Sequence, residues 1–195
     1  MRKVTLLFGL SVCLLSVSCQ DQPVPRAARS THQAFDLVGF LDQEAKSLEQ
    51  AHAQVKKTVL EDGQVMETKT MQDIEWAQEL GTFSEADLNK PALLGLFDVQ
   101  KTTNAQGQQV YQFTAKEDTD AMVQKATYTL DGQGRLVQLE ATLLQKNFLF
   151  TTHKQLTLHA QPGTHPQLQS YSLDESQTLL FSNTERYGVK GEVVR

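Results

Sequence analysis

Cysteine is almost absent from this chain: the two that occur, Cys13 and Cys19, both lie near the N-terminus. Residues 20–195 therefore form no disulfide with one another and supply no thiolate nucleophile or cysteine metal ligand. Positive charge is also scarce, because 18 Lys and Arg stand against 23 Asp and Glu, for a formal net charge of −5. This balance excludes a general electrostatic attraction to nucleic acid or to an anionic lipid surface.

The common motifs of hydrolases and nucleotide-binding enzymes are missing. No Gly-x-Ser-x-Gly sequence occurs, so no nucleophile elbow is predicted. Gly132-Gln133-Gly134 precedes a predicted strand, whereas a phosphate-binding loop opens a helix. The adjacent carboxylates Glu117-Asp118 and Asp174-Glu175 fall at predicted turns. The chain is therefore expected not to be an enzyme, and an envelope hydrolase is kept as an alternative.

The five histidines are dispersed, and neither a metal nor any other cofactor is expected. His153 and His159 share one face of a predicted strand, but six residues at about 3.3 Å each place them roughly 20 Å apart. Two nitrogens on one zinc ion must each lie about 2 Å from it. His32, His52 and His165 fall on other segments, so all five are interpreted as solvated polar residues.

One long apolar run is present, over residues 4–17, directly after Arg2 and Lys3. A basic start followed by such a run is typical of an export signal. The run is shorter than the roughly 20 residues that cross a bilayer as a helix. A signal peptide over residues 1–18 is therefore expected, and not a transmembrane helix.

The run ends in Leu14-Leu15-Ser16-Val17-Ser18-Cys19, which resembles the lipobox of bacterial lipoproteins except that Ser16 stands where leucine is usual. The resemblance implies that Cys19 is the lipid attachment site and that the chain is cut before it. It also implies a cell-envelope protein, and Gln20 in place of Asp implies the outer membrane, facing the periplasm or the cell surface. Residues 19–30 are then the lipidated cysteine and a flexible tether.

Residues 31–195 are expected to form a single α+β domain. Apolar residues at helical spacing predict one helix from His32 to Val55, capped by Ser30 or Thr31. Asp62-Gly63 between two β-prone runs predicts a hairpin. A second helix is expected from Asp73, with Trp76, Leu80 and Phe83 as its apolar stripe. It should stop within residues 87–91, because Pro91 disfavours helical angles at the residue before it.

After Pro91 the apolar residues alternate with polar ones, which predicts antiparallel strands that are covered on one face only. Together these signals predict an α+β fold with two N-terminal amphipathic helices and a hairpin packed on a curved antiparallel β-meander. Leu136 and Leu144 fall on the otherwise polar face, and they suggest a second surface for a hydrophobic ligand.

The segments Ile74-Glu75-Trp76-Ala77-Gln78-Glu79-Leu80 and Asp87-Leu88-Asn89-Lys90-Pro91 resemble uncharacterised lipoproteins of the Bacteroidota. The likeness extends to Phe-Asp-Leu at residues 35–37, Lys-Thr-Val at 57–59 and Tyr-x-Val-x-Gly at 187–191. It implies lipidation and placement in the cell envelope, and it carries over no functional residues.

The function expected from the sequence is that of a membrane-anchored, non-enzymatic binding or interaction module. Its partner is an unknown envelope protein or a hydrophobic ligand, and not nucleic acid. The alternative is a half-barrel-like carrier of an acyl chain or another hydrophobic molecule. Trp76 is interpreted as a core residue, while Asp87, Asn89 and Lys90 are either a helix stop or a recognition patch.

Overall fold

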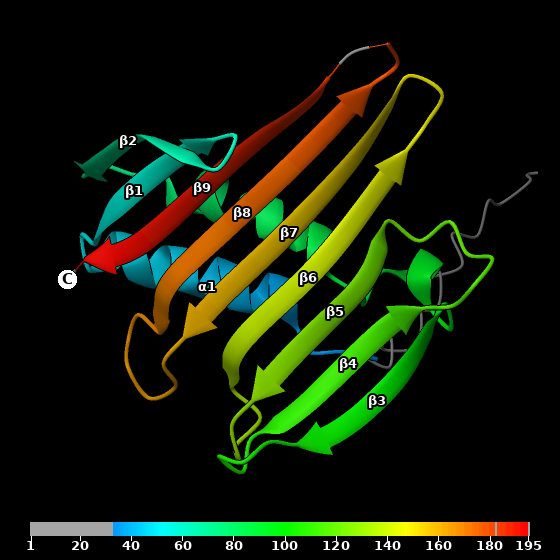
Figure 1. The fold of residues 1–195 in the computed structure, drawn as a ribbon. Helices are drawn as coiled ribbons and strands as arrows, with labels where there is room; N and C mark the ends of the chain where they lie inside the picture. The colour runs from blue at the N-terminus through cyan, green and yellow to red at the C-terminus, as the bar shows by residue number, and fades with distance from the viewer. Residues whose placement is uncertain (1–32, 182, 195) are drawn as a thin grey trace, which may run out of the picture. The chain divides into compact units, whose positions relative to one another are not determined.

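The computed structural model describes residues 33–181 and 183–194, all within a unit that spans Thr31–Arg195. The strands in these residues form one nine-stranded antiparallel sheet in the order β2-β1-β9-β8-β7-β6-β5-β4-β3 (Figure 1). The predicted signal peptide, Cys19 and the tether lie outside the described residues. The strands are β1 Gln54–Glu61, β2 Gln64–Met71, β3 Phe97–Thr103, β4 Gln109–Ala115, β5 Val123–Leu130, β6 Leu136–Lys146, β7 Phe150–Ala160, β8 Leu168–Leu179 and β9 Thr184–Val194.

The predicted α+β class with two N-terminal helices is wrong, although the antiparallel sheet is confirmed. Helices hold only 17% of the described residues. The predicted second helix is short, and the early hairpin is part of the large sheet and does not pack on it. The fold is therefore dominated by its sheet. Short helical segments cover one face of that sheet, called the inner face below.

The helix α1 spans Leu37–Gln50 and is shorter at both ends than its apolar spacing predicts. It begins there because the carboxylate of Asp36 accepts a hydrogen bond from the Gly39 N–H, which caps the first turn. It ends because His52 adopts a left-handed conformation, with φ of 48°, and the Ala53 N–H bonds back to the Leu48 carbonyl. Val55, the last residue of the predicted helix, instead lies in β1.

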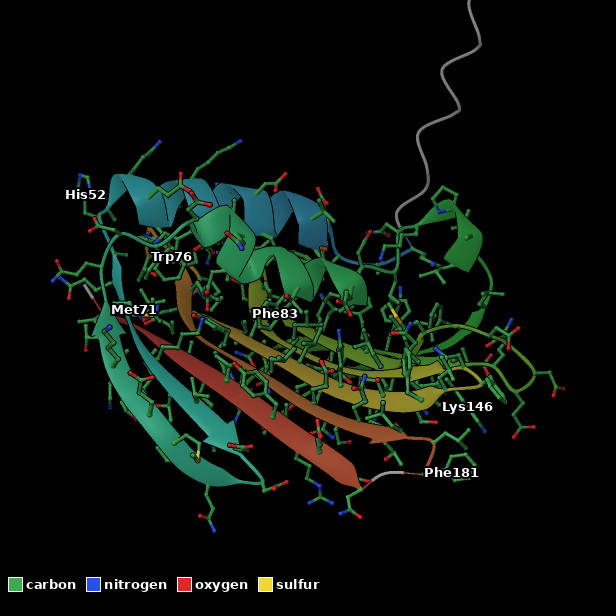
Figure 2. All side chains as sticks on the ribbon, turned by 90° about the horizontal axis from the view of Figure 1, so that it is seen from above. His52, Met71, Trp76, Phe83, Lys146 and Phe181 are labelled. Atoms are coloured by element: carbon green, nitrogen blue, oxygen red, sulfur yellow. The ribbon has the colours of Figure 1, made fainter. Side chains whose placement is uncertain are left out.

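The second helix, α2, covers only Trp76–Gly81 and continues as a 3-10 helix, η1, over Thr82–Ala86. Asp73 does not cap it: Glu75 holds the N-cap position, and its side chain makes no capping bond. A further 3-10 turn, η2, covers Pro91–Leu93. Figure 2 shows Trp76 and Phe83 between these helices and the sheet, where 1% and 2% of their surfaces are exposed.

The hairpin of β1 and β2 forms as predicted, because Asp62 and Gly63 both take left-handed φ angles of 47° and 79° at its turn. From β3 to β9, each strand pairs with the next along the chain. β9 then pairs with β1, so the last strand joins the hairpin to the meander. Every second residue of the strands faces the helices, and these positions supply a large part of the core, including Val55, Phe113, Ala126, Tyr128, Leu139, Ala141, Leu143, Leu156, Leu158, Tyr171 and Val189.

A buried carboxylate ties α1 to the start of β8. Glu44 is 1% exposed, and its Oε2 atom accepts hydrogen bonds from the Gln167 N–H at 2.7 Å and the Leu168 N–H at 2.8 Å. Two backbone donors satisfy the carboxylate where it is removed from water. The contact fixes the helix over the inner face at the end where β7 turns into β8.

Candidate functional site

A cavity of about 490 Å³, lined in part by apolar side chains, lies on the inner face between α2 and the strands β1, β2, β8 and β9. This volume is within the usual range for small-molecule sites. The cavity forms because the short α2 and η1 cover only part of the inner face at this end of the sheet. Its apolar lining consists of Met71, Ile74, Phe83, Leu173, Tyr187 and Val189.

Three polar side chains in the wall of this cavity bind one another. The Nζ atom of Lys57 lies 2.8 Å from Oε1 of Glu79, and the Tyr171 hydroxyl donates to the same oxygen at 2.5 Å. The side chains of Lys57 and Glu79 are 24% and 19% exposed. The group therefore connects α2 to β1 and β8, and each of its polar atoms already has a partner.

Tyr171 is held in place by the strand beside it. It lies directly opposite Gly191 of β9, and its ring occupies the space that a Cβ at position 191 would need. Burial raises the pKa of the Tyr171 hydroxyl, and its hydrogen bond to Glu79 raises it further. The hydroxyl is therefore a donor at neutral pH and not a nucleophile or a general base.

Negative charge predominates around the opening of the cavity. Asp73, Glu75 and Glu79 line it together with a single cation, Lys57. A second, larger cavity of about 720 Å³ adjoins the first at Tyr187, and its charged lining residues are Glu61, Asp62, Glu175, Glu185 and Arg186. Because carboxylates outnumber cations in both, the field at this end of the inner face favours a neutral or positively charged ligand.

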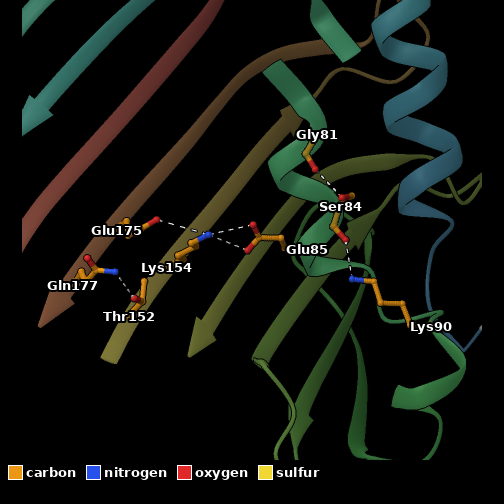
Figure 3. Close-up of polar contacts among 8 residues, drawn as sticks. All are labelled: Gly81, Ser84, Glu85, Lys90, Thr152, Lys154, Glu175 and Gln177. Carbon is orange, nitrogen blue, oxygen red and sulfur yellow. Dashed lines mark hydrogen bonds and ion pairs between the residues drawn. The ribbon is translucent and has the colours of Figure 1, made fainter. Parts of the chain in front are cut away.

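A second ion cluster closes the inner face next to η1. Figure 3 shows Lys154 between Glu85 and Glu175, with its Nζ atom 3.1 Å from the Glu85 carboxylate and 3.7 Å from that of Glu175. Thr152 and Gln177 form a hydrogen bond one step further along the same strands. These contacts hold η1 on β7 and β8, and they separate the apolar core from the open end of the sheet.

The residues weighed as metal or catalytic candidates are not brought together. His153 and His159 are exposed on the outer face, Gly132 and Gly134 lie in the turn between β5 and β6, and His52 ends α1. His32 lies outside the described residues. Within residues 33–181 and 183–194, no three His, Cys, Asp or Glu residues lie close enough to hold a metal ion.

The carboxylate pairs have separate surroundings. Glu117 and Asp118 fall in the turn between β4 and β5, as predicted, but Asp174 and Glu175 lie inside β8 and not at a turn. Within a strand they point to opposite faces, and Glu175 reaches the Lys154 cluster.

The possible recognition patch at Asp87, Asn89 and Lys90 is used internally. Asp87 accepts from the Asn89 N–H, and the Asn89 side chain bonds both Ala34 and Phe35. The ammonium group of Lys90 donates to the Ser84 carbonyl (Figure 3). These residues end η1 and attach the segment before α1, so the helix-stop interpretation explains them.

The predicted second surface at Leu136 and Leu144 does not form. A register shift between Thr129 and Leu130 of β5 turns Leu136 to the inner face, where it is 1% exposed. Leu144 remains half-buried on the outer face, among polar neighbours. The cavity residues Lys57, Glu79 and Tyr171 were not singled out from the sequence as a site, because nothing local connects them.

Comparisons with family models, curated proteins and solved structures find no match for this chain. The resemblance to Bacteroidota lipoproteins therefore stays a prediction. No helix in the described part of the chain has the length and apolar character to cross a membrane.

Proposed function

We propose that this protein is a lipid-anchored binding module of the cell envelope. Its ligand is a small, largely apolar molecule with a neutral or positively charged group. The observation that carries the proposal is the 490 Å³ cavity, in which six apolar side chains are surrounded by three carboxylates and one lysine. Apolar lining with a few placed polar groups is the usual composition of a small-molecule site.

The polar groups of the cavity support binding in preference to catalysis. Lys57, Glu79 and Tyr171 are bonded to one another, and the raised pKa of Tyr171 keeps its proton in place. A nucleophile or general base needs a free lone pair at working pH. The three groups instead stabilise the wall of the cavity.

The acidic opening also bears on the acyl-carrier alternative. The carboxylate of a free fatty acid would lie near Asp73, Glu75 and Glu79, where like charges repel. A quaternary ammonium group would instead be attracted by these carboxylates, and by the face of the exposed Tyr187 ring. The charge of the ligand head group therefore distinguishes the proposed function from the acyl-carrier alternative.

Calorimetric titration of the full chain with decyltrimethylammonium and with decanoate, below their aggregation limits, tests the proposal. We expect decyltrimethylammonium to bind at one site, at least roughly tenfold more tightly than decanoate. Leu173→Gln, within the cavity, should weaken this binding by about tenfold, since it removes apolar contact area. Leu144→Gln is the matched control, because Leu144 is also half-buried but lies on the outer face.

Two results would contradict the proposed ligand class. One is tighter binding of decanoate, which would favour the acyl-carrier alternative. The other is equal loss of binding in Leu173→Gln and Leu144→Gln, which would place the ligand elsewhere. The lipid anchor has its own test: the parent chain should fractionate with membranes and carry acyl mass on Cys19, and Cys19→Ala should lose both.

A further inference from the structure

The two most exposed large apolar residues of the described chain, Phe181 and Phe148, lie on two neighbouring turns at one end of the sheet, each beside an exposed leucine. Phe148 and Leu149 lie in the turn between β6 and β7, where they are 84% and 59% exposed. Leu180 and Phe181 lie in the turn between β8 and β9, with 49% and 98% exposed. We name these four residues the apolar tip.

The two turns are joined, so the apolar tip is one surface. The Leu180 N–H donates to the Leu149 carbonyl at 2.8 Å, and Phe150 lies opposite Leu179 at the adjoining strand ends. Figure 1 shows the two turns side by side, and Figure 2 shows Phe181 and Lys146 at the same end of the sheet, away from His52 and Met71. Four large apolar side chains on one projecting surface exceed the scattered apolar exposure that soluble proteins show.

The backbone holds Phe181 outward at some cost. Its φ angle is 65°, in the left-handed region that a bulky residue rarely adopts. Such outliers persist where the surroundings or the function require them. Here the result is a phenyl ring that is almost wholly in water in the isolated chain.

The shape and charge of the apolar tip fit a lipid bilayer. The two segments, residues 146–154 and 177–184, contain no Asp or Glu, in a chain whose net charge is −5, and Lys146 is exposed beside the turn. The tip therefore avoids the repulsion that the rest of the chain would meet at an anionic surface. Apolar side chains that project from turns can be removed from water by entering the interface of a bilayer, which requires no preformed complementary pocket.

From this arrangement we infer that the apolar tip inserts into the lipid bilayer, with Phe148 and Phe181 among the acyl chains and Lys146 at head-group level. This orientation of the domain is compatible with a lipid anchor at Cys19. The chain from Cys19 to Gln33, where the domain begins to hold it, can span at most about 50 Å, whereas β8, with 12 residues, is only about 40 Å long. The tether is therefore long enough for either end of the sheet to face the membrane.

A tryptophan reporter tests the inference in the full chain on phosphatidylcholine vesicles. The native Trp76 is 1% exposed and gives a constant background. In Phe181→Trp the added emission should shift to shorter wavelength and should be quenched by brominated acyl chains. Val65→Trp is the matched control, since Val65 is 63% exposed but lies on the edge strand β2, which β1 separates from β9. Its emission should remain that of an indole in water.

A second substitution identifies the driving contact. Phe148→Ser, introduced into Phe181→Trp, should weaken the partitioning of the tip by about tenfold, the effect of removing one buried aromatic side chain. Val65→Ser in the same chain should leave the quenching unchanged. Because 84% of Phe148 is in water, its loss does not disturb the core, and circular dichroism should be identical.

The inference is overturned if Phe181→Trp is not quenched on vesicles, or if Val65→Trp is quenched equally. In the first case the apolar tip stays outside the bilayer and serves a protein contact or no contact at all. In the second case the membrane contact of the domain is not made specifically by the tip. Neither result bears on the ligand cavity, because the titration of decyltrimethylammonium and Leu173→Gln reports on other residues.

Discussion

Replacement of Gly191 by alanine should test whether the packing of Tyr171 holds the cavity wall together. A Cβ at position 191 would lie inside the Tyr171 ring, so the ring must move and must give up its hydrogen bond to Glu79. Overpacking of this kind costs about 1–3 kcal/mol, and the lost bond to a carboxylate costs about 1.5–3 kcal/mol. Alanine in a strand returns about 0.5–1 kcal/mol. The net loss expected in the free energy of unfolding is about 1.5–5.5 kcal/mol.

Urea denaturation measures this loss directly. With a slope of about 2 kcal/mol per molar urea, the midpoint of Gly191→Ala should fall by about 1–3 M. In a Tyr171→Ala background the same substitution should be neutral or slightly stabilising, so the two sites should couple strongly in a double-mutant cycle. Gly188→Ala is the control within β9, because its Cβ would meet mainly the movable end of the Asp174 side chain.

An equal loss of stability for Gly191→Ala in both backgrounds would refute the reasoning. It would mean that the cost arises from the backbone of β9 and not from the Tyr171 ring. The decyltrimethylammonium titration adds a second readout, because displacement of Tyr171 should also distort the cavity and weaken binding.

Two further predictions concern buried polar groups. Glu44→Ala should lower the free energy of unfolding by about 3 kcal/mol, because it removes the acceptor for the Gln167 and Leu168 N–H groups, and urea denaturation beside the milder Glu44→Gln measures this. Burial raises the pKa values of Tyr128 and Tyr171, so both hydroxyls should stay protonated in the folded protein beyond about pH 10, where free tyrosine ionises. Their contribution to stability is complete below that pH and declines as the pH rises toward the folded values, so alkaline denaturation should be weaker in Tyr171→Phe, and phenolate absorbance should follow unfolding.

Local signals in the sequence predicted those elements whose geometry is set locally. The Asp62-Gly63 turn forms as expected, because both residues accept left-handed angles and the flanking strands are regular. The helical spacing was misleading beyond Gln50: Val55 fits the apolar stripe of a helix, but it is equally buried in β1. The spacing of apolar residues indicates which of them are buried, but it does not indicate where the chain changes direction.

Non-local pairing decided what the sequence could not predict. Leu136 was expected on the polar face, because a register shift between strands leaves no trace in an alternating pattern. The cavity wall joins Lys57 to Glu79 across 22 positions and Tyr171 to Glu79 across 92 positions. Such contacts depend on the order of strands in the sheet. The sequence alone predicted antiparallel strands but not that β9 lies beside β1.

The position of β9 has a consequence for how the chain folds. The hairpin of β1 and β2 is connected to the rest of the sheet only through β9. In this pairing Val194 of β9 lies opposite Gln54, near the start of the domain. Contacts between such distant segments have a high loop-closure entropy and slow the folding reaction. The hairpin of β1 and β2, which is synthesised first, can therefore join the sheet only after β9, which is synthesised last. Until β9 arrives, one side of the ligand cavity has no wall, so a partly synthesised chain has no complete binding site.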